Sequence, residues 1–524
     1  MKLRTIVKIA ITSSVVLLCS GFALYSFFRL SAAEGQKDFN LYELVPSTTS
    51  AVFVTDDVLE FVAEVDELTC SKNQQYLYVS KLFSYLKQSL YALSEDTPHG
   101  LSRQMNQMLI SFHEPDNERN QVLYCRLGNG DKELVNRFVR KYISSLYPPK
   151  TFIYKGEEII IYPMADGDFL ACYLTSDFMA LSFQKKLIEN VIDAYKSGKS
   201  LADDSTFTGI RAPKKSAAAA TIYTRMQGMM GWTEFDMKMK DDFIYFSGIT
   251  HDADTCFAFI NQLRQQQSVK GFPGEVLPST AFYFSRQGIT DWVSLLSYGN
   301  AQGQSVPART SEVQNRDKEF SRYLMENAGQ DLVACLFQRE DTLQGAAAVL
   351  SLSVADVTEA ERMLRALVNA APADEGRRNP RITFCYTVNK AYPIYRLPQT
   401  TLFEQLTSFA EPTLDVYAAF YVGRLLLAPD ADALAHYIRQ LDKGEVLNGA
   451  MVYQTGMDHL SDSYHFMLMA DFDHIFQQSE NHVRFVPDFF LRNADFFRHF
   501  TLFVQFACAD GVVYPNIVLK YKSE

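Results

Sequence analysis

Histidine and aspartate residues gather near the end of the chain, where such side chains could bind a metal ion. Five of the nine histidines lie in one stretch, with aspartates between them: His459, His465, His474, His482 and His499. A metal needs ligands that converge, such as histidines four residues apart on a helix, and these spacings are of another kind. Asp471, Asp473 and His474 could meet at one turn, but this turn lacks the glycine and terminal glutamate of a calcium-binding loop. We therefore expect solvated polar residues and no metal site.

Motifs that bind nucleotides or supply a nucleophile are absent from the sequence. The chain contains neither the phosphate-binding Gly-x-x-x-x-Gly-Lys-Ser/Thr nor a Gly-x-Gly-x-x-Gly that opens a helix. It also lacks the Gly-x-Ser-x-Gly elbow of many hydrolases. Gly128 to Asp131 is typical of a turn followed by a helix N-cap. We predict no cofactor and no catalytic residue. An enzyme with residues scattered along the chain stays a less favoured alternative.

Phenylalanines are concentrated between residues 485 and 506. The candidates for an apolar ligand site or a partner surface are Phe485, Phe489, Phe490, Phe496, Phe497 and Phe500. Aromatic residues at this density usually build a core, and the last hairpin needs one. An aromatic groove for an apolar ligand, or an exposed patch for a partner or membrane, is the other interpretation.

The elements that would carry these residues follow an apolar N-terminal segment. Residues 9–28 contain no charge, and basic residues flank them: Lys2, Arg4, Lys8 and Arg29. Twenty helical residues span about 30 Å, which is the thickness of a bilayer's hydrocarbon core. A cleaved signal peptide usually has a shorter apolar region. Residues 1–30 are therefore predicted to be an uncleaved single-pass anchor, although Ser31 and Ala33 would suit a signal peptidase.

The distribution of charge predicts which side of the membrane the chain occupies. The basic N-terminus favours the cytoplasm, which puts the bulk of the chain on the extracytoplasmic side of the inner membrane. The whole chain has 61 acidic against 50 basic residues, and four of the basic ones flank the anchor. This acidic balance argues against nucleic acid as a partner. Seven cysteines follow the anchor. We expect them to be buried free thiols, and one disulfide bond between two of them is the alternative.

Two halves of the chain share a pattern of elements. Pro46-Ser47-Thr48 leads into an apolar strand at 51–54, and Pro278-Ser279-Thr280 leads into another at 281–284. An amphipathic helix with a glycine at its end follows in each half, over 187–201 and 433–447. The pattern predicts a duplication.

Each half also ends in a predicted hairpin, over 235–249 and 501–520. Tight polar turns join most strands, which favours an α+β fold of two related domains of antiparallel sheet with helices. The predicted domains cover 44–270 and 275–524, with a junction near 265–274 and a tether at 31–43.

The layout resembles a domain-of-unknown-function family of anchored bacterial envelope proteins. The resemblance rests on the basic start, the apolar anchor, Leu44 to Ser47 before the first strand, and strand pairs at 151–163 and 383–397. It implies a location in the cell envelope and carries over no activity and no site residues.

Together these observations predict a membrane-tethered, periplasmic-facing binding protein without catalytic activity. Its partner would be an envelope protein or a lipid. A carrier or sensor of a lipid or another apolar ligand is the alternative, because the phenylalanines lie on a chain held near a membrane. A hydrolase-type envelope enzyme is third.

Overall fold

The computed structural model describes residues 39–522 with the exception of short and long gaps at 73–104, 114–118, 129–130, 139–146, 165–166, 211–217, 226–231, 251–257, 297–310, 340–344, 371–380, 389, 408–412, 478–485 and 487. Among the described residues, no helix is both long and apolar enough to cross a bilayer. The predicted anchor at 1–30 lies outside the described residues, so it stays a prediction.

The chain folds as an α+β protein with an antiparallel sheet, as the sequence predicts. The elements of the first half are η1 (Leu41–Leu44), β1 (Ala51–Thr55), α2 (Val58–Glu67), α3 (Thr69–Lys72), β2 (Met108–Phe112), β3 (Gln121–Arg126), α5 (Asp131–Phe138), β4 (Lys150–Tyr154), β5 (Glu157–Pro163), β6 (Phe169–Leu174), β7 (Phe178–Ser182), α6 (Lys185–Ser197), α7 (Ser205–Ile210), β8 (Ala220–Thr224), β9 (Thr233–Lys240) and β10 (Phe243–Thr250).

Among the described residues, the second half carries more helices. Its elements are α8 (Ala258–Gln265), β11 (Val269–Lys270), η4 (Pro273–Val276), β12 (Ala281–Gly288), α10 (Ser311–Asn327), β13 (Ala328–Gln338), β14 (Ala346–Val354), α11 (Val357–Ala370), β15 (Ile382–Tyr386), β16 (Ala391–Arg396), α12 (Leu402–Leu406), β17 (Tyr417–Tyr421), β18 (Arg424–Ala428), α13 (Ala431–Asp442), η5 (Leu447–Gly449), α14 (Met451–Met457), β19 (Ser463–Tyr464), β20 (Phe466–Asp471), α15 (Phe472–Phe476), α17 (Asp488–Arg492), α18 (Ala494–Phe497), β21 (Phe500–Ala509) and β22 (Val512–Tyr521).

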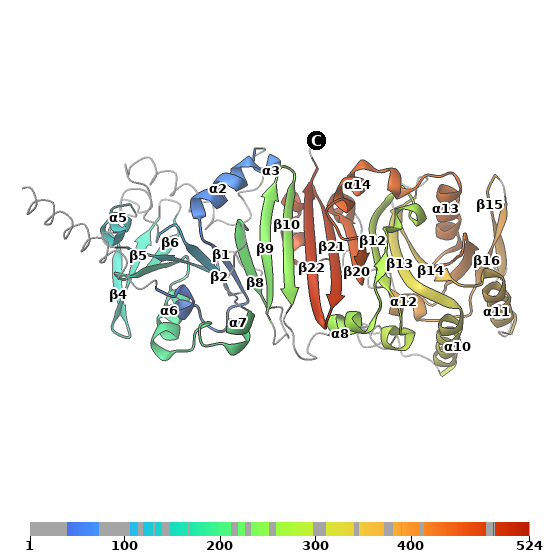
Figure 1. Cartoon of the computed structure of the whole chain (residues 1–524), viewed down its shortest axis with the longest axis horizontal. Coiled ribbons are helices and arrows are strands. Elements are labelled where there is room, and N and C mark those ends of the chain that lie inside the picture. The colour runs from blue at the N-terminus through green and yellow to red at the C-terminus, as the bar shows by residue number, and fades with distance from the viewer. Residues whose placement is uncertain are drawn as a thin grey trace, which may run out of the picture.

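The strands of the two halves follow one order. The first half runs β4-β5-β6-β7-β3-β2-β1-β8-β9-β10. The second half runs β15-β16-β17-β18-β14-β13-β12-β20-β21-β22. The last strand of each half pairs with that of the other, β10 with β22, so one 20-stranded sheet crosses the molecule (Figure 1).

This continuous sheet joins the two predicted domains through β10 and β22. The predicted boundary at residue 270 also falls inside β11, which pairs with β19 of the second half. The polar and glycine-rich composition of residues 265–274 predicts a junction. Composition does not predict which half such a segment packs against.

One row of cross-strand partners relates the two halves. From the central pair Ser247 and Asn516, the row passes outward through Asp236, Thr221 and Val54 in the first half. In the second half it passes through Gln505, Met467 and Arg286. Counting the same number of strands outward from the central pair therefore reaches strands that hold the same position in the two strand orders.

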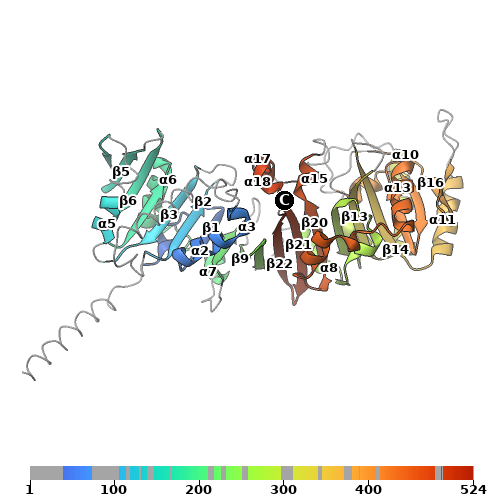
Figure 2. The same cartoon turned by 90° about the horizontal axis from the view of Figure 1, so that it is seen from above.

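Helices cover both faces of the sheet. On one face, which we call the α6 face, α6 and α13 each lie over their own apolar core. On the opposite face, which we call the α2 face, one core extends through both halves and includes residues of α2, α10 and α11. Figure 2 shows α17 and α18 gathered on one side of the central strands, next to the C-terminus.

The local signals in the sequence agree with several element ends. Helix α6 buries Leu187, Ile188, Val191 and Ile192, and Gly198 ends it with a φ of 62°. Helix α13 begins at Asp430, whose carboxylate accepts a hydrogen bond from Ala433 N at 2.7 Å. Both closing hairpins form, with Asp241 and Asp510 at positive φ in their turns.

Two smaller expectations have different outcomes. The described part of the predicted tether, residues 39–43, is not a free linker, because Leu41 and Tyr42 of η1 are buried in the core beneath α6. Five cysteines are buried free thiols as expected: Cys70, Cys125, Cys172, Cys335 and Cys385. Cys508 is a half-buried free thiol, and Cys256 lies outside the described residues.

The turn between β17 and β18 holds an unfavourable residue, which leads to a first prediction. Val422 has a φ of 41° and is 78% exposed, and Gly423 follows it with a φ of 73°. A β-branched residue is strained in this left-handed region, whereas Asn is accepted there. We expect Val422→Asn to stabilise the protein by about 1 kcal/mol, measured as a higher urea midpoint. Asp510→Asn, in a turn that already suits Asp, is the control and should leave the midpoint unchanged. A midpoint for Val422→Asn equal to or below that of the parent would contradict the strain.

Candidate functional site

Three charged side chains meet on the α6 face of the second half, where β12 ends and β13 and β18 begin. Asp331 of β13 accepts hydrogen bonds from Arg286 Nε of β12 at 3.1 Å and from Arg424 Nη2 of β18 at 3.3 Å. The Asp331 side chain is 9% exposed, and the two arginine side chains are 16% and 14% exposed. We call these three residues the Arg-Asp-Arg cluster. Each stands near an end of its strand, so strand register brings them together.

The electrostatics of the cluster keep Asp331 ionised. Burial alone would raise the pKa of its carboxyl group, but the positive charges of Arg424 and Arg286 outweigh burial and hold this pKa below its ordinary value. Arg424 also donates from Nε to Ser351 Oγ at 2.5 Å and from Nη2 to Ser351 O at 3.0 Å. The cluster is therefore a set of mostly buried charges that compensate one another.

Arg286 also binds the segment between α8 and β12, which we call the connection. Its Nη1 donates to Gly271 O at 2.8 Å and to Lys270 O at 3.3 Å, and lies 3.3 Å from Tyr464 Oη. Tyr464 Oη donates to Gly271 O as well, at 2.8 Å. The connection at 269–271 is thus held beside the cluster.

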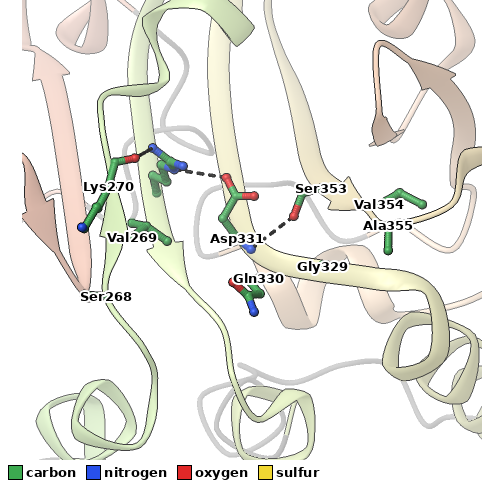
Figure 3. A pocket seen from close by; sticks show the side chains of 10 residues that line it. Ser268, Val269, Lys270, Gly329, Gln330, Asp331, Ser353, Val354 and Ala355 are labelled. Carbon is green, nitrogen blue, oxygen red and sulfur yellow. Dashed lines mark hydrogen bonds and ion pairs between the residues drawn. The ribbon is translucent and has the colours of Figure 1, made fainter.

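A cleft of about 530 Å³ lies between this connection and the ends of β13 and β14. Its lining combines polar and small residues: Ser268, Val269, Lys270, Arg286, Gly329, Gln330, Asp331, Ser353, Val354 and Ala355. Asp331 N donates to Ser353 Oγ at 3.4 Å. Figure 3 shows Ser353 beside Asp331, with the Lys270 ammonium directed away from Asp331. The volume is that of a small-molecule site.

The first half has no such cluster at the matching positions. Counting along matched registers puts Val54, Gln107 and Phe178 where the second half has Arg286, Asp331 and Arg424. The ring of Phe39 packs against Phe178 with centroids 4.8 Å apart. The same strand arrangement therefore forms with mostly apolar residues at this place.

The six phenylalanines of the sequence prediction have several placements. Phe485 lies outside the described residues, and of Phe489 only the backbone is described, in α17. The other four lie together: Phe490 and Phe497 have ring centroids 4.7 Å apart, Phe496 and Phe497 4.9 Å, and Phe496 and Phe500 5.0 Å. Phe497 and Phe500 are buried, and the group belongs to the core of the α2 face. These contacts are those of a packed core; ligand binding by these residues stays a prediction.

A core role gives a measurable expectation for Phe496. The ring is half-buried and touches two other rings, so Phe496→Ala is expected to destabilise the protein by about 1–2 kcal/mol. Urea unfolding would measure this loss. Phe169→Ala, at a ring that is 57% exposed, is the matched control and should cost less than about 0.5 kcal/mol. If Phe496→Ala leaves stability unchanged, the ring is not part of the core.

The histidine-rich stretch does not converge on one point. His459 packs beside Phe243, His465 accepts a hydrogen bond from Cys508 N, and His474 lies 3.2 Å from the Asp471 carboxylate. His499 packs against Tyr521, and His482 lies outside the described residues. In the part of the chain that the structure describes, no three His, Cys, Asp or Glu side chains are grouped as metal ligands.

A serine–histidine pair that the sequence analysis missed lies in the first half. Ser111 Oγ is 2.9 Å from His113 Nε2 and 3.1 Å from Tyr124 Oη. Ser111 is fully buried, and burial lowers the pKa of His113 to about 4. A nucleophile must touch its substrate, and this hydroxyl cannot, so the pair serves to satisfy buried polar groups.

The two outer edges of the sheet form a different kind of surface. Among the described strands, β4 pairs only with β5, and β15 pairs only with β16. The two hairpins lie at opposite ends of the molecule (Figure 1). Their exposed apolar residues are Phe152, Ile153, Ile382, Phe384 and Tyr386. An apolar edge strand with unpaired backbone groups is a template for another strand.

Comparison with known proteins gives no relative from which a function could be inferred. No family model, no curated protein and no solved structure matches this chain. The resemblance to anchored envelope proteins stays a prediction. The candidate sites are therefore the cleft beside the Arg-Asp-Arg cluster and the two edge hairpins.

Proposed function

We propose that the chain is a membrane-tethered, extracytoplasmic binding protein without catalytic activity, which holds an extended segment of a partner protein at the edges of its sheet. The tether is the predicted anchor at 1–30, and the location follows from the positive-inside rule and from the resemblance to envelope proteins. The body is one sheet that places two edge hairpins at opposite ends (Figure 1).

The observation that carries the proposal is the exposure of apolar side chains on both edge strands. Ile153 of β4 is 72% exposed, and Phe384 and Tyr386 of β15 are 54% and 71% exposed. Soluble proteins usually protect an edge strand with charges, proline or a covering element. Strand addition by a partner would pair the free backbone groups and cover these side chains.

We also propose that the two halves arose by duplication. The shared strand order and the row of partners centred on Ser247 and Asn516 support this. Matched edges at both ends would let one chain hold two segments of the same kind, so a duplicated body suits a bridging role.

The carrier alternative has less support from the geometry. The apolar cavity beneath α10 is lined by residues such as Phe320, Leu364 and Phe403, and its volume is about 10 Å³. This is room for about one water molecule, far below the volume of a lipid chain. An interaction protein remains the function that the described surfaces favour.

Photocrosslinking at single positions in the native cell tests the proposal. A photoreactive phenylalanine analogue would replace Ile153 or Phe384 in the full chain, and Met451 as the control. Met451 is 77% exposed but lies on α14, away from both edges. We expect a defined protein adduct from the two edge positions and none from Met451. Adducts absent at both edges, or equal at all three positions, would refute partner binding at the edges.

A further inference from the structure

We propose that the cleft beside the Arg-Asp-Arg cluster binds the oxyanion group, a carboxylate or a phosphate, of a small ligand. Arg286 would supply the positive charge inside the cleft, and Lys270 would add a second one at its rim. The site lies at one end of β12 to β14, apart from the two edge hairpins, and goes beyond the function proposed above.

Charge favours an anion at this place. Two cationic side chains, Lys270 and Arg286, line the cleft with one carboxylate, Asp331, and Arg424 stands behind that carboxylate. The lining thus carries two positive charges and one negative charge, and Arg424 adds a third positive charge behind the carboxylate. Because Asp331 is already compensated by two arginines, an incoming anion meets a net positive site.

Donors remain available for a ligand. Arg286 uses Nε for Asp331 and Nη1 for the connection, while its Nη2 makes no hydrogen bond within the described residues. Over the same residues, Lys270 Nζ has no ion pair, and the residue is exposed at the rim of the cleft. A guanidinium and an ammonium group are the usual partners of carboxylates and phosphates.

The first half shows that the fold itself does not require the charges. The same strands pair there with Val54 and Phe178 at two of the matched positions, and Gln107 comes directly before β2 at the third. Burying a cluster of charges is costly and is often neutral or worse for stability than apolar residues of similar size. A cluster that the fold does not need, beside a cleft of about 530 Å³, is therefore best explained by a ligand.

The uncharged residues that line the cleft suit a small organic anion. Val269, Val354 and Ala355 supply apolar surface, and Gln330 and Ser353 supply polar groups. Gly329 lies so close to Ser353 that a Cβ would stand 2.5 Å from Ser353 Oγ, so a larger residue there would displace the Ser353 side chain. The ligand class is a small carboxylate or phosphate ester with a short apolar part.

Isothermal titration calorimetry on the full chain in a non-ionic detergent tests this site. The probes are inorganic phosphate and succinate, titrated separately so that the two oxyanions are distinguished. The variants are Lys270→Glu and Ala355→Glu, both at exposed positions that should fold normally. Lys238→Glu, at an exposed lysine of β9 in the first half, is the matched control for charge reversal.

We expect saturable binding of at least one probe by the parent chain and by Lys238→Glu. The affinity should fall about tenfold in Lys270→Glu and in Ala355→Glu, because each places a negative charge beside the anion. Ala355→Arg should bind at least as tightly as the parent. An absence of saturable heat with both probes would overturn the proposal, and so would equal affinities in all the variants.

Discussion

Replacing Asp331 with Asn is expected to destabilise the protein by about 3–5 kcal/mol, because it leaves two buried arginines without their counter-charge. The carboxylate lies 3.1 Å from Arg286 Nε and 3.3 Å from Arg424 Nη2, and all three side chains are at most 16% exposed. Asn keeps the shape of the side chain and removes only the charge. Urea unfolding followed by tryptophan fluorescence and by circular dichroism would measure the loss.

The control for this variant is an ion pair in which one partner is exposed. Arg119 and Asp168 are 3.0 Å apart, but the Arg119 side chain is 60% exposed. Asp168→Asn should therefore cost less than about 1 kcal/mol. Equal losses for Asp331→Asn and Asp168→Asn would show that the Arg-Asp-Arg cluster contributes no more than a surface pair.

The effect of Asp331→Asn should also depend on pH. The pKa of Asp331 is lowered in the folded state, so its contribution is present above the unfolded pKa of an aspartate, about 4, and is lost as pH falls through the lower, folded value. The difference between the parent and Asp331→Asn should be constant near neutral pH and shrink in acid below about pH 4. A difference that instead grows in acid would contradict a lowered pKa.

A triple variant separates stability from binding at the same place. Arg286→Val, Asp331→Gln and Arg424→Phe together copy the residues of the first half. Replacing a buried charged cluster by residues of matched size is often neutral or stabilising. We therefore expect this chain to fold about as stably as the parent, far better than Asp331→Asn, and to lose anion binding.

The hairpins and helix ends are the part of the fold that the sequence predicts well. Asp510-Gly511 and Asp241-Asp242 stand between alternating strands, and their turns form as expected. Gly198 and Gly444 follow amphipathic helices and have positive φ. These signals are local, since a positive φ or an N-cap depends on a few neighbouring residues.

Long-range pairing is the part that the sequence could not predict. β10 and β22 join the two halves through residues such as Ser247 and Asn516, which lie in different halves of the chain. Their alternating apolar pattern suits any neighbouring strand, so nothing in it indicates a continuous sheet. The sequence therefore predicts two related domains but not the strand pair that joins their sheets.

The Arg-Asp-Arg cluster was missed for the same reason. Arg286 and Asp331 are 45 residues apart, and Asp331 and Arg424 are 93 apart. A signal was present, because each is a charged residue next to a run of apolar ones. Only the register of three strands shows that these charges are neighbours. The phenylalanines and histidines are dense in the sequence, but a high density of such residues is as typical of a core as of a functional site.

Gly288 lies where the connection between α8 and β12 touches the sheet, and its replacement should have the second large effect. A Cβ at this position would stand 2.0 Å from Gln267 O and 3.3 Å from Val269 Cγ1. The nearest obstacle is main chain, which cannot rotate away as a side chain can. The connection is also pinned beside it, because Gln266 Oε1 accepts hydrogen bonds from Thr290 N and Asp291 N.

Gly288→Ala is therefore expected to cost about 3 kcal/mol, at the upper end for overpacking. To relieve the contact, residues 267–270 must move away from β12, and Val269 and Lys270 form one wall of the cleft. The variant should thus lose anion binding together with stability, as measured by calorimetric titration and urea unfolding. Gly449→Ala, where a Cβ would meet nothing within 4 Å, is the control and should change neither. If Gly288→Ala binds anions like the parent chain, the connection is not a wall of the site, and the cationic groups must come from β12 and β18 alone.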